Sequence, residues 1–148
     1  MIEHDEICGL MPHAENMCLL DRVTDWDEST IVCESSSHML QDNPLRTSEG
    51  LTSVSLIEYG AQSMAVHGGL IAREKGGDFG DGYLAALRDV SFERMDVSHI
   101  TNKIVVMAEM LMSQNGNLVY SFHVSANDEC IVHGRATVVE VKNNNAKA

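Results

Sequence analysis

The clearest hydrophobic pattern in the sequence is a helical repeat from Val54 to Arg73. Apolar or small residues recur there at steps of three and four: Val54, Ile57, Ala61, Met64, Ala65, Gly68 and Ile71. Other apolar residues fill the remaining sides: Leu56, Ala65, Val66 and Leu70. A helix that is apolar on most sides is typically buried. Thr52 or Ser53 can cap its beginning, and Gly76-Gly77 ends it. We therefore expect one long helix that a sheet surrounds.

Strand-like runs rich in Val, Ile, Leu and Tyr follow this helix: Gly82 to Val90, Lys103 to Ser113, Asn117 to Ala126 and Glu129 to Val141. Asn115-Gly116 and Asn127-Asp128 predict hairpin turns between them. A short strand, Thr30 to Glu34, precedes the helix. The pattern predicts no helix or strand in three stretches: the residues up to Pro12, Asp25 to Ser29, and Ser35 to Gly50. This order predicts an α+β fold in which an antiparallel sheet curls around one central helix.

Composition adds limits on size and partners. The 148 residues fit a single domain, 1–148, with a polar end at Asn143 to Ala148 that we expect to fray. The first thirty residues lack the pattern of a secretory signal, and no run of eighteen apolar residues predicts a membrane span. A formal net charge of -12 argues against a nucleic-acid partner, because phosphate backbones require clustered Lys and Arg.

The four cysteines, Cys8, Cys18, Cys33 and Cys130, form no CxxC pair, and none stands at zinc-ligand spacing from a histidine. We therefore expect reduced, mostly buried thiols in a cytoplasmic protein, with no metal site and no cofactor. The sequence also lacks GxSxG, GxxxxGK[ST] and HExxH motifs, which excludes the commonest hydrolase, nucleotide and zinc-protease signatures.

Two side chains are candidates for chemistry. Glu58 lies in the first turns of the predicted buried helix, where the helix dipole favours its charged form and burial disfavours it. His38 follows a strand-like run and has an ordinary pKa near neutrality, which suits a general base. The alternatives are a first-turn acid that only compensates the helix dipole and a surface-loop histidine. His67, within the helix pattern, is interpreted as a hydrogen-bonded packing residue.

Four stretches, in matching order, resemble the hotdog-fold 3-hydroxyacyl-[acyl-carrier-protein] dehydratases. They are Leu10-Met11-Pro12-His13 with Met17 to Val23, Ile57-Glu58-Tyr59-Gly60-Ala61-Gln62, Tyr83 to Phe92, and Gly134 to Val138. The second stretch is similar to the family's "EA-AQ" helix motif, whose acid is catalytic. The resemblance implies a hotdog fold, a dimer with sites that two subunits can share, no cofactor, and an acyl carrier protein as partner.

One departure from that family concerns the second catalytic group. The family's "GHFP" histidine lies fourteen residues before the acid, and that position is Pro44 here. With His38, Asn43-Pro44-Leu45-Arg46 and Ala65-Val66-His67-Gly68, the chain looks more like the small dehydratases of aryl polyene clusters. In that comparison His38, twenty residues before Glu58, replaces the usual histidine. Asp42-Asn43-Pro44-Leu45 also resembles the (R)-specific enoyl-CoA hydratase motif, but Arg46 stands where that motif has histidine.

The resemblance implies dehydration of a 3-hydroxyacyl thioester to a trans-2-enoyl thioester. His38 would remove the C2 proton, and protonated Glu58 would assist departure of the C3 hydroxyl. Backbone N–H groups at Ser53 and Val54 would polarise the thioester carbonyl. Two alternatives stay open. Hotdog thioesterases also place an acid on this helix, and the chain could be a non-catalytic or weakly active subunit that pairs with a second dehydratase, as a heterodimer rather than a homodimer.

Overall fold

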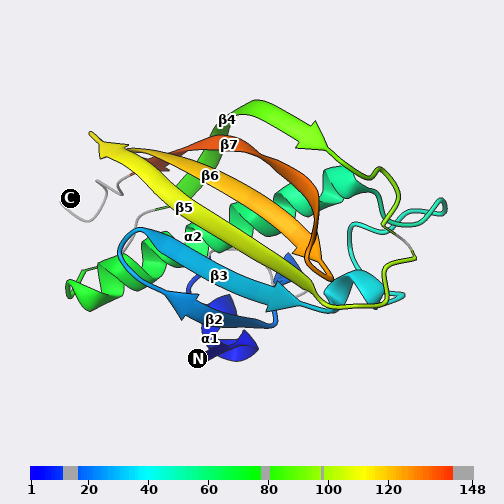
Figure 1. Ribbon diagram of the computed structural model, residues 1–148. Helices are drawn as coiled ribbons and strands as arrows, with labels where there is room; N and C mark the ends of the chain where they lie inside the picture. Colours follow the sequence, from blue (N-terminus) through cyan, green and yellow to red (C-terminus); the bar gives the residue numbers. More distant parts are fainter. Residues whose placement is uncertain (12–16, 78–80, 98, 142–148) are drawn as a thin grey trace.

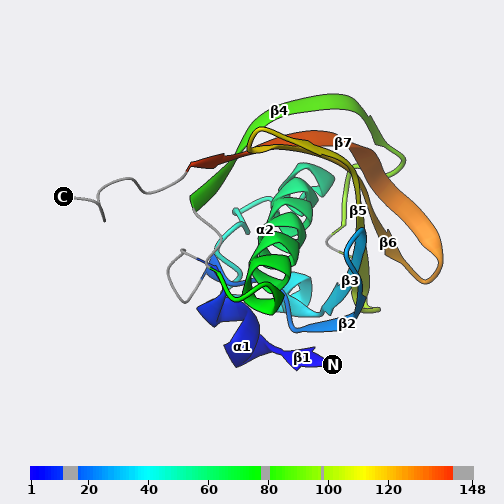
Figure 2. The same ribbon diagram turned by 90° about the vertical axis from the view of Figure 1, so that its left-hand side faces the viewer.

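The computed structural model describes residues 1–11, 17–77, 81–97 and 99–141. Its helices and strands, in chain order, are β1 (Ile2–Glu3), α1 (His4–Gly9), β2 (Arg22–Trp26), β3 (Thr30–Ser35), the 3₁₀ helices η2 (Ser37–Met39) and η3 (Ser53–Ser55), α2 (Leu56–Glu74), β4 (Asp81–Phe92), β5 (Ile104–Gln114), β6 (Asn117–Ala126) and β7 (Glu129–Val141). The strands form one antiparallel sheet in the order β1-β2-β3-β5-β6-β7-β4. The sheet curves around α2 (Figures 1 and 2), which confirms the predicted α+β arrangement.

The central helix α2 is buried along most of its length, as its apolar pattern predicts. A Cβ atom at Gly60 would lie 3.0 Å from the Phe122 ring, so glycine allows the helix to approach β6 closely there. Gly76 has φ +77° and donates its N–H to the Arg73 carbonyl, while the Gly77 N–H bonds to Ala72. These two bonds form the Schellman motif that glycine favours. The predicted helix end is therefore confirmed.

The hairpin turns that the sequence predicted are also present. Asn115 and Gly116 have φ angles of 53° and 82°, and Asn127 and Asp128 have 53° and 63°. Positive φ at both central residues is the type I′ geometry, whose twist matches the flanking strands. β6 and β7 have the predicted bounds, and β3, β4 and β5 differ from their predictions by one or two residues at an end.

The N-terminal region differs from the prediction of an irregular segment. β1 pairs with β2, and α1 follows it directly, with Ile7 fully buried. β2 continues to Trp26, into the stretch that was predicted to be turn-rich. β1, α1 and β2 are too short to show a hydrophobic period. Tertiary contacts stabilise them, because β2 pairs with β3 and Ile7 of α1 packs into the core. The predicted frayed end and His13 lie outside the described residues.

The prediction of four reduced thiols is wrong for two cysteines. Cys8 of α1 and Cys18 form a disulfide, whereas Cys33 is a buried free thiol and Cys130 an exposed one. Sequence spacing did not indicate this pair, because docking of α1 beside the start of β2 is what brings the two residues together. Among the described residues, no helix is both long and apolar enough to cross a membrane.

Strand β4 forms one edge of the sheet and pairs only with β7 among the described strands. The side chains from Tyr83 to Asp89 are all exposed, and Tyr83, Leu84 and Leu87 leave 55%, 37% and 42% of their surface accessible. An edge strand with exposed large apolar side chains is the usual mark of a protein-protein contact. The other edge of the sheet is β1, a strand of two residues.

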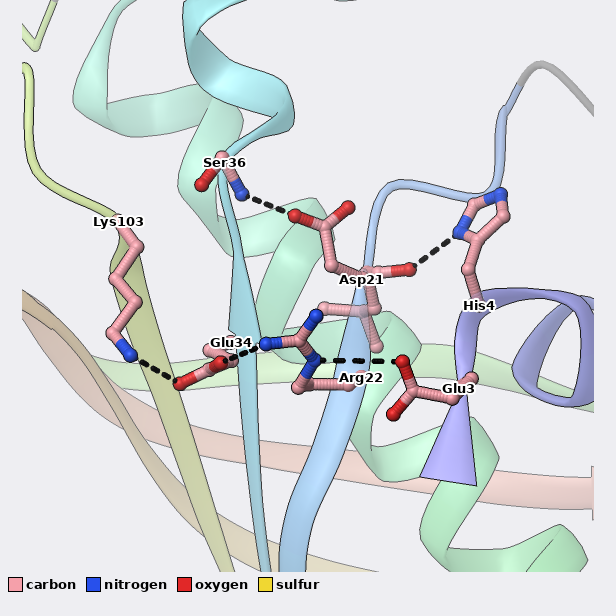
Figure 3. A network of polar contacts seen from close by, with 8 residues as sticks. Glu3, His4, Asp21, Arg22, Glu34, Ser36 and Lys103 are labelled. Carbon is pink, nitrogen blue, oxygen red and sulfur yellow. Dashed lines mark hydrogen bonds and ion pairs between the residues drawn. The ribbon is translucent and has the colours of Figure 1, made fainter. Parts of the chain in front are cut away.

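Glu34 of β3 connects three parts of the sheet. Its carboxylate accepts a hydrogen bond from Arg22 Nη1 at 3.0 Å and contacts Lys103 Nζ at 2.9 Å (Figure 3). Both cations lower the pKa of Glu34, with Lys103 the larger cause. Because Glu34 is mostly buried, this network fixes β2, β3 and the start of β5 relative to one another.

Candidate functional site

Glu58 lies in the first turn of α2 and is half-buried. It lines a cavity of about 220 Å³ between α2, the N-terminal segment and the first residues of β4. The lining residues are Met11, Glu58, Ala61, Gln62, Ala65, Gly82, Tyr83, Leu84 and Val138. Among these residues Glu58 is the one carboxylate, and most of the others are apolar. The structure therefore places the predicted acid in a small, largely apolar cleft.

Gln62, one helical turn after Glu58, holds that carboxylate in place. Its Nε2 donates to Glu58 Oε2 at 2.8 Å and to the Met17 carbonyl at 2.5 Å, while its Oε1 accepts the Leu19 N–H at 2.9 Å. The side chain is 3% exposed, and these bonds orient its amide. Gln62 belongs to the motif Ile57 to Gln62, but the sequence does not indicate its role, because Met17 and Leu19 approach it only in the folded chain.

His38 lies in η2, where it is 2% exposed. Its Nε2 donates to the Ile100 carbonyl at 3.2 Å, and this bond fixes the tautomer in which Nδ1 carries the lone pair. Nδ1 is buried and makes no hydrogen bond to the described residues. Burial lowers the pKa of His38, although the Ile100 and Asn102 backbones oppose that effect. The imidazole is therefore held neutral.

Among the described residues, His38 and Glu58 do not line a common cavity within a single chain. His38 does not line the Glu58 cavity, and the charged groups that face its ring are Arg46 and Asp21. The Arg46 guanidinium also donates to the His38 backbone carbonyl at 2.7 Å. The alternative of a surface-loop histidine is excluded, because the ring is buried.

A polar network that the sequence did not predict joins η2 to α2. The buried Tyr59 hydroxyl accepts from Asn43 Nδ2 at 3.0 Å and lies 2.8 Å from Ser37 Oγ. Asn43 Nδ2 also donates to the Ser37 carbonyl at 2.8 Å. Burial raises the pKa of Tyr59, so the phenol remains protonated and can donate to Ser37. These bonds fix the position of His38 relative to the helix that carries Glu58.

Ser53 and Val54, the predicted donors to the thioester carbonyl, lie in η3 directly before α2. The Ser53 N–H donates to the Met95 carbonyl at 2.9 Å, and its hydroxyl faces the Met95 sulfur. Ser53 is fully buried, whereas Val54 is 53% exposed. The backbone donor of Ser53 is therefore occupied, which leaves the Val54 N–H as the candidate that a substrate can reach.

His67 has the packing role that the sequence predicted. It is fully buried in α2, with Nδ1 2.7 Å from the Tyr120 hydroxyl and Nε2 2.8 Å from the Asp27 carbonyl. Burial lowers its pKa and keeps the ring neutral.

Spacing along the sequence did not indicate a metal site at the cysteines, but the fold brings two of them close to a histidine. His4, Cys8 and Cys18 place one ligand atom each within 4.8 Å of one another. In the disulfide form the two sulfurs are bonded to each other, so neither offers a thiolate to a metal ion.

Comparisons with known proteins agree with this architecture. The model of the ApeP-like family, described as ApeP dehydratase, matches residues 5–148. Among solved structures, the dehydratase heterocomplex ApeI:P from Xenorhabdus doucetiae superposes with a TM-score of 0.83 at 19% identity, covering 95% of this chain and 94% of that one. A search of curated protein sequences found no significant match.

More distant structures share the fold. AziG from S. sahachiroi gives a TM-score of 0.60 at 16% identity, covering 90% of this chain and 99% of that one. A hypothetical thioesterase protein with coenzyme A from Streptococcus pneumoniae gives a TM-score of 0.61 at 8% identity, covering 82% of this chain and 86% of that one. At these identities the likeness establishes the hotdog fold alone, and it does not distinguish dehydration from hydrolysis.

Proposed function

This chain belongs to the ApeP-like dehydratase family, and we propose that it converts 3-hydroxyacyl thioesters on an acyl carrier protein to trans-2-enoyl thioesters. The observation that supports this most directly is the Glu58 carboxyl group in a mostly apolar cavity, oriented by Gln62. The proposed setting is cytoplasmic synthesis of an aryl polyene or a related lipid, with no cofactor.

Glu58 would act as the acid. Gln62 Nε2 donates to Oε2, so a proton on this carboxyl group resides on Oε1. The protonated carboxyl would donate to the C3 hydroxyl, which then leaves as water. The Val54 N–H would donate to the thioester carbonyl oxygen as negative charge develops there.

His38 remains the proposed base for the C2 proton. Its tautomer is the one that a base requires, because Nε2 is the donor and Nδ1 carries the lone pair. Since the ring is 2% exposed, the proposal requires that substrate or a partner subunit open a path to Nδ1.

We also propose that the chain acts as a dimer, either with itself or with a second dehydratase. Gly82, Tyr83 and Leu84 wall the Glu58 cavity and belong to the exposed edge strand β4. A partner that pairs along β4 would therefore cover the apolar side chains of that edge and close the cavity beside Glu58. The solved heterocomplex of ApeI:P supports the heteromeric form.

The buried ring of His38 favours one alternative, in which this chain is a weakly active subunit that needs a second dehydratase. In that case the partner would supply the base, and Glu58 or the cavity would be this chain's contribution. A thioesterase activity would differ in its product, a free acid rather than an enoyl thioester.

The test incubates the purified chain, alone and with a second hotdog dehydratase, with a 3-hydroxyacyl carrier protein, and follows loss of water by intact-protein mass spectrometry. The variant E58Q keeps an oxygen that Gln62 can bond but cannot supply the proton, and a fall of about 10²-fold or more is expected. E74Q, at the exposed end of the same helix, is the matched control and should retain full activity. Undiminished turnover by E58Q would exclude Glu58 as the acid.

His38 needs a separate comparison, because its ring is buried. H38Q, with thermal unfolding measured beside it, should retain a cooperative transition and lose about 10²-fold or more in turnover if the imidazole is the base. The alternative role as a weakly active subunit predicts a different result. The wild-type chain would then be active only when the partner is present, and H38Q would be equally active in that mixture.

A further inference from the structure

Three side chains with metal-binding atoms meet at the N-terminus, outside the proposed catalytic cavity. His4 and Cys8 are four residues apart in α1 and so lie on the same side of that helix. Cys18 arrives from the segment that precedes β2. One ligand atom from each residue lies within 4.8 Å of the others. A disulfide between Cys8 and Cys18 does not by itself require a histidine beside it.

The His4 ring is oriented for such a role. Its Nδ1 donates to the Leu20 carbonyl at 2.7 Å, a bond drawn in Figure 3. That bond fixes the tautomer and leaves the lone pair on Nε2, which lies 3.4 Å from Cys8 Sγ. Metal-binding histidines commonly donate their second nitrogen to a backbone carbonyl in this way, because it fixes the ring and makes the ligand nitrogen more basic.

We propose that His4, Cys8 and Cys18, when the disulfide is reduced, form a dithiolate–imidazole site for one borderline-soft divalent cation of the zinc class. In a tetrahedral zinc site, Zn–N of about 2.0 Å and Zn–S of about 2.3 Å place the nitrogen and a sulfur about 3.5 Å apart. The observed 3.4 Å between His4 Nε2 and Cys8 Sγ matches that separation. A rotation of the Cys18 side chain separates the two sulfurs, and water takes the fourth position.

The two forms of the cysteine pair exclude each other. Reduction by a small dithiol breaks the Cys8–Cys18 bond: two electrons and two protons pass to the sulfurs, and the reductant becomes a disulfide. Binding of the cation then releases the two thiol protons, because thiolates are the ligands. A reducing compartment would keep the pair as thiols, so the metal-bound form is the one relevant there.

The surroundings permit entry of a cation. His4 and Cys18 also line an open cavity of about 300 Å³, together with Asp21 and Asp42. Carboxylates at that wall favour a cation over an anion. The remaining cysteines are poorly suited to compete, since burial raises the pKa of Cys33 to about 11 and Cys130 is a single exposed thiol.

The test uses the full chain reduced with a phosphine under anaerobic conditions, with Co²⁺ as a spectroscopic probe. We expect one Co²⁺ per chain, with thiolate-to-cobalt charge transfer and the intense visible bands of tetrahedral cobalt, and displacement by Zn²⁺. The same chain oxidised to the Cys8–Cys18 disulfide should show none of these bands. This readout does not depend on dehydratase activity.

Variants assign the ligands. C8S and C18S should each abolish the thiolate charge-transfer band, and H4A should weaken Zn²⁺ binding by about a hundredfold or more in competition with a chromophoric chelator. C130S is the matched control and should bind as the reduced wild type does. Thermal unfolding of each reduced variant checks the fold. Absence of cobalt bands in the reduced wild type, or unchanged binding by C8S, would overturn the proposal.

Discussion

Replacing Gln62 with leucine isolates the contribution of the amide that holds Glu58. The Gln62 side chain is 3% exposed and bonds the Leu19 N–H, the Met17 carbonyl and the Glu58 carboxylate. Leucine has a similar size and no polar atom. The variant Q62L would therefore leave two backbone groups of the 17–19 segment without their partner, while Glu58 could turn toward solvent.

The expected cost follows from those two backbone groups. A buried donor or acceptor that loses its partner costs about 1–3 kcal/mol, so Leu19 and Met17 together account for about 2–6 kcal/mol. Greater burial of apolar surface by the leucine offsets about 1–2 kcal/mol. Taking the middle of both ranges, we expect a net loss in free energy of unfolding of about 2–3 kcal/mol. For a chain of this size, that corresponds to a fall in melting temperature of about 4–12 °C.

Urea unfolding followed by circular dichroism measures this cost, with an unchanged m-value as the check that the denatured state is the same. The matched control is S63A, which removes a buried hydroxyl bonded to the Tyr59 carbonyl, an acceptor within the helix itself. That control should lose about 1 kcal/mol or less. A loss below about 0.5 kcal/mol in Q62L would refute the role assigned to the amide.

Three further predictions concern the close packing of two neighbouring strands, the geometry of a turn, and the pH dependence of stability. A Cβ atom at Gly134 would lie 2.9 Å from Val90 Cγ2, so G134A should lower the free energy of unfolding by about 1–3 kcal/mol in urea unfolding. Adding V90A removes the atom that clashes and should restore part of the lost stability. Gly116 has φ +82°, so G116A should cost about 1–2 kcal/mol in the same assay although space for the methyl group exists. Burial lowers the pKa of His38 and of His67, so the unfolded chain binds these protons at higher pH than the native chain does. The two neutral imidazoles therefore contribute their full stability above about pH 6.5, and this contribution falls as the pH is lowered further. A melting temperature that stays constant from about pH 7 to pH 5.5 would contradict this expectation.

Local signals were sufficient for the central helix and the hairpins. The α2 prediction rested on apolar spacing, and its end on two glycines, because a Schellman motif needs a residue that tolerates positive φ. Asn115-Gly116 specified its turn for the same reason. Each of these features depends on residues within a few positions of one another, so the sequence shows them directly.

The placement of Glu58 followed from the same periodicity, but its surroundings did not. Leu19 and Met17 contact Gln62 across 43 and 45 positions of the chain, and His38 reaches Ile100 across 62. Contacts at such separations depend on how the sheet curls around the helix, and no local pattern encodes them. For this reason the sequence identified His38 as a candidate base but did not indicate that its ring is buried.

Residue spacing along the chain was sufficient to predict one long buried helix with a carboxyl group in its first turn, followed by antiparallel strands with defined turns. Residue spacing expresses those properties because helices and hairpins are closed by short-range hydrogen bonds. The folded chain alone shows that Cys8 and Cys18 pair beside His4, and that β4 leaves an apolar edge beside Glu58. These arrangements require segments distant in sequence to pack together, and packing of that kind is specified by the whole core rather than by any one segment.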